Sequence, residues 1–409
     1  MQIRLSEDAP DQAIVGRPEV GEFIELAVAF ADAIRILGSG ASLAEAEHRI
    51  QAQHGVEVDL AELVEALEDV GFVAELDGRP IPDPHKPAVS HVPWLTAAHV
   101  RWLFGTPAKL AYAALVTATL VTVARRPDLL PLYRDFFWTD YVGLAVLVNT
   151  VMFSLAATAH ELSHLAAARS LGSPGRIAFA TRLHHLVLQT DVTAIWLVPR
   201  KYRYRVYLSG MLCDLAVICT AILLIAHVSL PPVADRLLAA LIVVLVASMA
   251  LQVQLYMRTD LYFVLLDLLR CRNLFHDGLA YTRHLLRRLG HAIAPARFAV
   301  THDPAADLPA HERRAVRIYA AAVVVGSAIS LGSFAVYGLP IIVYGVSTAL
   351  SAIIDGVSGG KVLAAVDGTL IVLVEGALQA IFLVTFYRRY RHRLRWRRRP
   401  DRSASDAEE

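Results

Sequence analysis

Two histidines and a glutamate occur at a spacing suited to metal chemistry in the segment His160-Glu161-Leu162-Ser163-His164. Positions i and i+4 of an α-helix lie on one face, about 6 Å apart along the axis, so two imidazoles at this spacing can bind one metal ion. The pattern is typical of zinc sites in which the glutamate acts as general base on a metal-bound water. We therefore predict that His160 and His164 are zinc ligands and that Glu161 is the catalytic base. A third protein ligand must come from elsewhere in the chain.

The surrounding sequence favours metal binding over a chance match to this pattern. Residues 142–159 form an apolar run that leads directly into His160. Ionisable groups in or beside such a run are costly to bury unless they are paired or bound to a metal. The alternative is a helix on which the histidine is an ordinary core residue, and the apolar setting argues against it.

The chain as a whole is too apolar for an ordinary soluble enzyme, since 56% of its 409 residues are hydrophobic and the mean hydropathy is +0.46. A membrane-spanning helix needs about 20 apolar residues. Six segments are candidates, at 109–124, 141–168, 206–228, 237–257, 316–337 and 362–387. Residues 340–354 are also apolar but contain Pro340 and Gly345, so we expect them to be re-entrant or interfacial. The first 80 residues lack the short apolar core of a signal peptide, and the first span is expected to direct insertion.

Basic residues indicate the topology because cytoplasmic loops are enriched in Lys and Arg. The basic segments are 169–205, 258–315 and 388–402, whereas 229–236 and 338–361 contain almost no Lys or Arg. Both basic loops and both termini are therefore predicted to be cytoplasmic. The loop at 125–140 carries three arginines and is nevertheless expected on the other side. We interpret the basic tail as holding this topology and contacting anionic membrane lipid.

The third ligand is expected near the cytoplasmic end of the fourth span, because the histidines lie near the cytoplasmic end of the second. Asp260 lies three residues beyond the fourth span. A carboxylate oxygen is an accepted zinc ligand, and with two imidazoles it leaves one position for water. Asp260 is therefore the predicted third ligand.

Other polar residues are candidates for support of the site. Asp191 could accept a hydrogen bond from a ligand histidine, and Asp267 could orient the Asp260 segment. His184 and His185 lie in an alternating stretch, 177–198, that predicts a hairpin near the site. We expect them at the membrane interface, with substrate contact or a ligand role as alternatives. Three further acids lie within predicted spans and are either functional or paired with a cation near a helix end; they are Asp214, Asp367 and Glu375.

Several segments carry a resemblance to a known family. The chain combines His160-Glu-Leu-Ser-His164 with Asp260-Leu-Tyr-Phe-Val-Leu-Leu-Asp267 and a following Asn273-Leu, and residues 198–203 read Val-Pro-Arg-Lys-Tyr-Arg. In this it resembles the M50, or site-2-protease-like, membrane metalloproteases, especially the peptide zinc metalloprotease group, over residues 100–390. The resemblance implies that His160, His164 and Asp260 bind Zn²⁺ and that Glu161 is the base.

The chain departs from that family pattern near Asp260. Gln254 and Leu255 replace an Asn-Pro pair, and Leu261 replaces a glycine. The family asparagine is thought to hold the substrate or its oxyanion, and Gln254 could supply similar hydrogen bonds with a longer reach. The ligand set itself is intact, so the departures bear on proteolysis more than on metal binding.

The N-terminal residues predict a small α+β winged-helix domain. Strands are expected at 12–16, 22–27 and 72–74, and helices at 29–37, 42–54 and 59–70. Ser42 and Asp59 each begin a capping-box pattern, with Glu45 and Glu62 three residues later. Residues 1–80 contain 17 acidic and five basic side chains, a net charge of −12 that would repel nucleic acid.

This domain resembles the PqqD-like domains that recognise leader peptides. The resemblance rests on residues 16–26, 36–46 and 67–73, which share an apolar pattern and glycine positions with that family. It implies that an extended peptide adds to a sheet edge beside the third helix. The alternative is a purely structural or dimerising cap.

Together these features predict an α-helical polytopic membrane protein of about six spans with a small N-terminal α+β winged-helix domain. The expected parts are a peptide-binding domain (1–78), a proline-rich linker (79–100), a metalloprotease domain (101–390) and a basic, then acidic, tail (391–409). The expected function is that of a cell-membrane zinc metalloendopeptidase that matures, or confers immunity to, a ribosomally made peptide. The alternatives are a catalytically weak or inactive zinc-containing partner in peptide binding or export, and a site-2-type regulated intramembrane protease. A transporter is disfavoured because the two halves share no motif.

Overall fold

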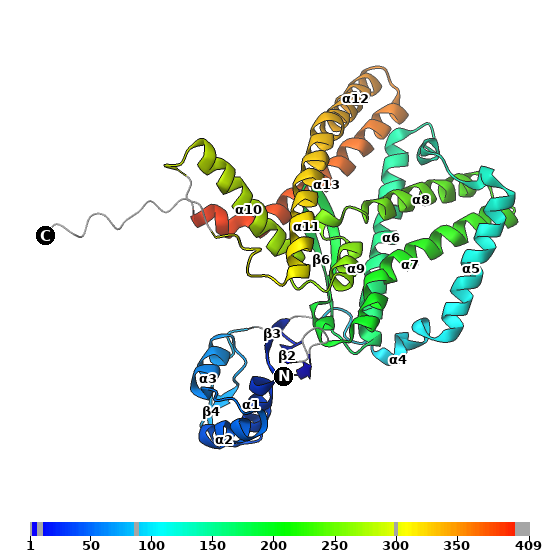
Figure 1. Cartoon of the computed structure of the whole chain (residues 1–409). Helices are drawn as coiled ribbons and strands as arrows, with labels where there is room; N and C mark the ends of the chain where they lie inside the picture. The colour runs from blue at the N-terminus through cyan, green and yellow to red at the C-terminus, as the bar shows by residue number, and fades with distance from the viewer. Residues whose placement is uncertain (1, 6–10, 86–89, 298–301, 397–409) are drawn as a thin grey trace. The chain divides into compact units, whose positions relative to one another are not determined.

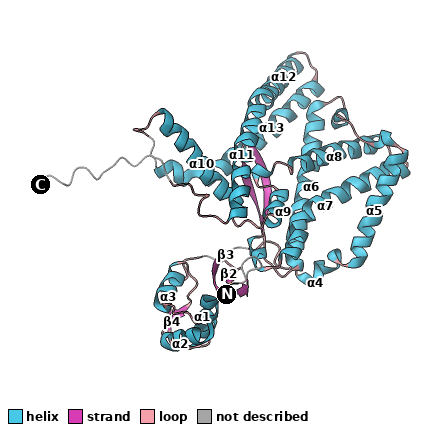
Figure 2. Cartoon of the chain, in the orientation of Figure 1, coloured by secondary structure: helices cyan, strands magenta, loops and turns pink. Residues whose placement is uncertain are grey.

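The computed structural model describes the backbone of residues 2–5, 11–85, 90–297 and 302–396, and it is mainly helical (Figure 2). The chain clusters into two compact units. The first consists of residues 1–109, 162–177 and 190–209, and the second of 110–161, 178–189 and 210–409. Several elements run through both units, among them the helix that carries the two motif histidines.

The N-terminal part of the first unit begins with an antiparallel sheet in the order β1-β2-β3. Its strands are β1 (Gln2–Leu5), β2 (Gln12–Arg17) and β3 (Glu22–Ala27); helices α1 (Val28–Gly38), α2 (Leu43–His54) and α3 (Leu60–Asp69) follow, then β4 (Glu75–Leu76) and β5 (Arg79–Pro80). The strands expected at 12–16 and 22–27 and all three helices are confirmed. The strand expected at 72–74 is wrong, because Phe72 N bonds back to Leu67 O at the end of α3 and strand pairing starts only at Glu75. The winged-helix arrangement stays a prediction.

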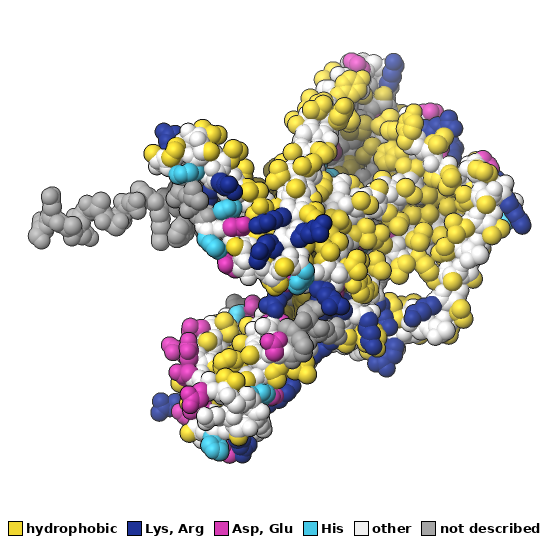
Figure 3. Space-filling view, viewed as in Figure 1, with side chains coloured by type: hydrophobic (Ala, Val, Ile, Leu, Met, Phe, Trp, Pro, Cys, Tyr) yellow, Lys and Arg dark blue, Asp and Glu magenta, His cyan; other side chains and the backbone are white. Residues whose placement is uncertain are grey.

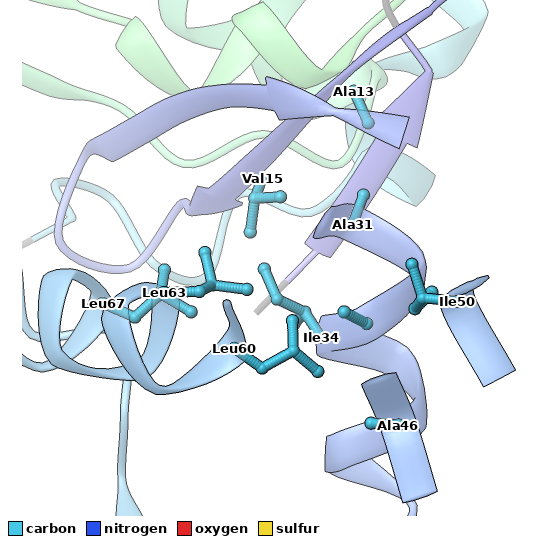
Figure 4. Close-up of a cluster of buried hydrophobic side chains, with 10 residues drawn as sticks. Ala13, Val15, Ala31, Ile34, Ala46, Ile50, Leu60, Leu63 and Leu67 are labelled. Atoms are coloured by element: carbon cyan, nitrogen blue, oxygen red, sulfur yellow. The ribbon is translucent and has the colours of Figure 1, made fainter. Parts of the chain in front are cut away.

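Caps and an apolar core explain why these elements form. Ser42 accepts a hydrogen bond from Glu45 N, and Asp59 Oδ1 accepts from Ala61 N and Glu62 N at 3.0 Å each. Apolar side chains of the sheet and the helices meet in one cluster (Figure 4). Its members include Ala13, Val15, Ala31, Ile34, Ala46, Ile50, Leu60, Leu63 and Leu67. Acidic side chains are seen on the outside of this part (Figure 3).

Short elements complete the first unit, namely α4 (Ala97–Val100), the 3₁₀ turn η1 (Arg101–Phe104) and the 3₁₀ turn η4 (Thr193–Leu197). Arg4 Nη1 donates to Leu197 O at 3.1 Å, which ties β1 to η4. The predicted linker, 79–100, contains β5 and α4, and within it His91 N donates to Gly175 O at 3.0 Å.

Within the described part of the chain, six helices are long and apolar enough to cross a membrane; Figure 1 shows their course. They are α5 (Thr106–Arg125), α6 (Val142–Ser170), α7 (Arg200–His227), α8 (Pro232–Leu251), the run Ala310–Ser358, and α13 (Val362–Trp396) as far as Arg391. Apolar side chains dominate their visible surfaces (Figure 3). Since unpaired apolar surface on this scale is costly in water, these helices are compatible with a membrane protein.

Shorter elements lie between these helices. They are η2 (Pro127–Leu129), η3 (Tyr133–Phe136), β6 (Arg176–Arg182), β7 (His185–Asp191), η5 (Leu255–Met257), α9 (Asp260–Leu268) and α10 (Leu274–Ile293). Strands β6 and β7 pair with each other, which confirms the hairpin predicted within 177–198.

The segment 340–354 is helical and continuous with the preceding candidate span. Helix α11 (Ala310–Ser333) continues through a π-helical turn, η6 (Phe334–Gly338), into α12 (Leu339–Ser358), and the position of this segment relative to a membrane stays a prediction. Pro340 is tolerated because it falls in the first turn of α12, beside the π-turn that already alters the backbone hydrogen bonding. The chain then reverses at Gly359 and Gly360 into α13, whose last residues overlap the predicted tail 391–409. Residues 397–409 lie outside the described part of the chain.

Asp367 of α13 binds the start of α6. Its Oδ1 accepts a hydrogen bond from Leu144 N at 3.0 Å, and a Cβ at Gly143 would collide with Asp367 O. Within the described residues, this acid of a candidate span thus pairs with the N-terminal end of a helix.

Candidate metal centre

Helix α6 carries the two motif histidines on one face. It is continuous from Val142 to Ser170. His160 and His164 are 7% and 5% exposed, respectively. Two imidazoles that are buried one turn apart require polar partners or a metal, because an unsatisfied polar group in an apolar setting is costly.

Asp260 joins this pair as the first residue of α9. Its Oδ2 lies 3.0 Å from His160 Nε2. One candidate ligand atom from each of His160, His164 and Asp260 lies within 4.8 Å of the others. Ligands about 2.0–2.1 Å from a tetrahedral metal lie about 3.4 Å apart. The group could therefore hold a metal ion after side-chain movements of about 1.5 Å or less.

The hydrogen bonds of the histidines leave the correct nitrogen for a metal. His160 Nδ1 lies 2.7 Å from Asp214 Oδ2, and His164 Nδ1 lies 2.7 Å from Val206 O. Each acceptor favours a proton on Nδ1, so Nε2 is the nitrogen of each ring that would bind a metal; at His160 the metal would replace the contact of Nε2 with Asp260 Oδ2. Such outer hydrogen bonds are the usual support of metal-bound histidine, and the donor set of two nitrogens and one oxygen fits zinc.

The Asp260 segment is fixed by a glutamine that lies before it. Gln252 Oε1 accepts a hydrogen bond from Asp260 N at 3.0 Å, and Gln252 O accepts one from Thr259 Oγ1 at 2.6 Å. Gln254, the candidate substrate or oxyanion contact, instead accepts a bond from Tyr256 Oη at 2.7 Å. The side-chain oxygen of Gln254 is therefore engaged, and its amide NH₂ is the group that could donate to a substrate.

Arg182, at the end of β6, is a partly buried cation near the candidate site. Burial lowers the pKa of its guanidinium, and the carboxylates of Asp260 and Glu161 act in the opposite direction. Arg182 stays charged because an arginine keeps its proton in proteins. Its Nη2 donates to Gln189 Oε1 at 3.1 Å on the neighbouring strand. A fixed positive charge thus lies near the predicted base and the predicted third ligand.

The remaining predicted residues lie in different surroundings. Asp191 accepts hydrogen bonds from Thr193 N and Oγ1, at 3.2 and 2.6 Å, at the base of the hairpin. Asp267 is buried on α9, two turns after Asp260. His184 stacks on Phe334 with the ring centroids 4.5 Å apart. The ring centroids of His184 and His185 are 4.0 Å apart.

Three supporting residues were not assigned such roles from the sequence. Asp214 was recognised only as an intramembrane acid, and Arg182 only as a topological charge. Gln252 was not singled out. Asp214 had the strongest available signal, since an acid in an apolar span must find a partner. No local pattern in the sequence identifies that partner as His160.

Asp214→Asn is expected to weaken metal binding about 10–100-fold, because the carboxylate that orients His160 and increases its basicity is lost. Competition with a chromophoric chelator measures the change. Ser209→Ala is the matched control, since Ser209 Oγ lies 3.3 Å from His164 Nδ1, for which Val206 O remains as acceptor. Equal affinities in the two variants would contradict the role of Asp214.

The hairpin is expected to lose stability in mild acid. Burial, and then the nearby charge of His184, lower the pKa of His185 to about 4. Between pH 6.5 and 4 the unfolded hairpin binds a proton that the folded hairpin does not, so its stability falls as the pH falls through that range. Amide exchange of residues 178–189 at pH 7 and pH 5, corrected for intrinsic rates, measures this. His185→Phe should abolish the difference, and an unchanged difference in that variant would assign it to other groups.

No protein-family model matches the chain, and neither a curated protein nor a solved structure matches it. The functional assignment therefore depends on the chemistry of the site.

Proposed function

We propose that this chain is an integral membrane zinc metalloprotease. The observation that carries the proposal is the buried group of His160, His164 and Asp260, with both histidine Nδ1 atoms held by protein acceptors. Glu161, directly after the first ligand, and the six long apolar helices support it. The resemblance of the two motif segments to the M50 metalloproteases agrees with this chemistry.

Different residues of the candidate site would carry out different steps of peptide hydrolysis. A zinc ion bound there would lower the pKa of a water ligand and polarise a carbonyl group. Glu161 would take the proton from the attacking water as the new C–O bond forms. It would then pass that proton to the amine that leaves when the C–N bond breaks. Arg182 would donate hydrogen bonds to the negative charge that develops on the carbonyl oxygen.

The N-terminal domain is proposed to capture the substrate peptide. The outer edge of β3 has no partner strand among the described residues, because the sheet order is β1-β2-β3. An extended peptide could add to that edge through main-chain hydrogen bonds. With both termini in the cytoplasm, a ribosomally made peptide would be captured there, for maturation or in immunity. The acidic surface disfavours a nucleic acid as the partner.

The alternative is a zinc-containing peptide-binding partner with little or no catalysis. It is favoured by the bond from Tyr256 to Gln254, which occupies the side-chain oxygen of a residue proposed to contact substrate.

Metal content and cleavage, measured together, test the proposal. The full chain in detergent should contain one zinc and should cleave fluorescein-labelled casein. Phenanthroline should remove both properties, and added zinc should restore them. One zinc without cleavage would support the binding partner. Absence of metal after purification in excess zinc would overturn the metal centre itself.

A further inference from the structure

Helix α10 carries an apolar stripe that is buried at one end and exposed at the other. In its first half Leu274 is fully buried, and a Cβ at Gly278 would lie 2.8 Å from Tyr319 Cδ1 of α11. The first half therefore packs tightly against a candidate membrane span.

The second half continues the same stripe without burial. Its large apolar side chains are Leu285, Leu286, Leu289 and Ile293, which are 42%, 61%, 60% and 78% exposed. Leu285, Leu289 and Ile293 follow one another at four-residue spacing on the helix face that holds Leu274 and Gly278, and Leu286 lies at the edge of that face, three residues before Leu289. Four exposed side chains of this size on two and a half turns are an unusual surface unless another apolar phase covers them.

The opposite face of this half is basic. Arg283, Arg287 and Arg288 are exposed, and residues 283–293 contain no Asp or Glu. Figure 3 shows apolar side chains together with Lys or Arg and His at the protruding helix that Figure 1 labels α10. A helix with a large apolar face and a cationic polar face is typical of segments that lie in the headgroup region of a bilayer.

We propose that the second half of α10 docks on an anionic bilayer surface, with its leucines in the acyl boundary and its arginines among the headgroups. Two observations favour lipid over a protein partner. The helix packs on α11, part of a candidate span, which keeps it close to any bilayer that the span crosses. The exposed charge is entirely cationic, which complements anionic lipid.

This docking would be linked to the metal centre through two tyrosines. Tyr262 Oη on α9 accepts a hydrogen bond from Phe275 N at 3.0 Å on α10. Tyr319 Oη on α11 donates to Leu255 O at 3.0 Å, five residues before Asp260. Lipid that holds α10 in place would therefore also hold the segment that carries the third ligand.

Fluorescent labels on the full chain in nanodiscs test the docking. Two variants are prepared, each with the three native cysteines replaced. One carries its label at Leu289→Cys on the apolar face, and the matched one carries it at His291→Cys on the polar face. In discs with anionic lipid, a nitroxide on the acyl chain should quench the label at 289 at least threefold more than the label at 291. Combined Arg283→Glu, Arg287→Glu and Arg288→Glu should reduce this ratio to near one in anionic discs.

Circular dichroism and size-exclusion chromatography of each labelled protein report whether it is folded, independently of whether the chain holds a metal. Equal quenching at 289 and 291 in folded protein would overturn the proposal. So would shielding of residue 289 that depends on the number of chains per disc rather than on lipid charge, since that would indicate contact with a second copy.

Discussion

Asp260→Ala is expected to lower the zinc content from one ion per chain to about a tenth or less. Two histidines from one helix cannot retain zinc against a chelating buffer, and the third ligand atom, Asp260 Oδ2, lies only 3.0 Å from His160 Nε2. Elemental analysis of the purified chain after dialysis measures the loss. The helices should remain intact by circular dichroism, because the change removes one side chain at the first residue of α9 and leaves the apolar faces of the long helices unchanged.

Asp277→Ala is the matched control, since Asp277 is a partly buried acid on α10 outside the three-residue group. It should leave the zinc content unchanged. If Asp260→Ala keeps a full equivalent of zinc, the third ligand lies elsewhere. His184 and His185 would then be the next candidates for replacement.

Features of the fold that depend on neighbouring residues along the chain were predictable. The apolar runs predict both ends of α6 to within two residues. They also predict where α7 ends and where α13 begins, but α7 begins earlier than expected and α13 continues as a helix into the basic tail. Capping residues such as Ser42 and Asp59 mark helix starts because they bind the first free backbone N–H groups. These are local effects, so the sequence alone contains them.

Features that depend on a distant partner were not predictable. Strand β1 forms because Gln2–Leu5 pairs with β2, which requires the sheet to exist first. Residues 340–354 were expected to form a separate re-entrant or interfacial segment because of Pro340 and Gly345, but a π-turn joins them to α11 as one continued helix. Neither outcome can be derived from local propensity.

The candidate site likewise combines features that follow from the local sequence with features that depend on a distant partner. The helical spacing of His160 and His164 follows from the sequence, and the topology predicted from the basic loops led to the expectation that Asp260 lies in the same region. The hydrogen bonds that His160 Nδ1 donates to Asp214 and that Asp260 N donates to Gln252 join residues on different elements or across a turn. Their geometry depends on how those elements pack, and no spacing rule describes it.

Glu161→Gln is expected to lower the cleavage rate by about 10²–10⁴-fold while the zinc content stays at one per chain. The amide has nearly the same shape as the carboxylate but cannot accept the proton of the attacking water. Because Glu161 is not one of the three candidate ligands, the metal should be unaffected. Initial rates on labelled casein and elemental analysis of the same preparation measure the two quantities.

Glu375→Gln is the matched control for this change, since Glu375 is also an acid in an apolar helix and only accepts a hydrogen bond from Gln379 at 2.8 Å. Its rate should equal that of the unmodified chain.

If Glu161→Gln cleaves as fast as the unmodified chain, Glu161 is not the base, and any hydrolysis observed arises at another group or from a contaminant. If instead Glu161→Gln loses zinc along with activity, Glu161 acts through the metal centre rather than on the water. A loss of rate at full zinc occupancy therefore distinguishes general-base catalysis from a structural role, because only the first requires a proton acceptor at this position.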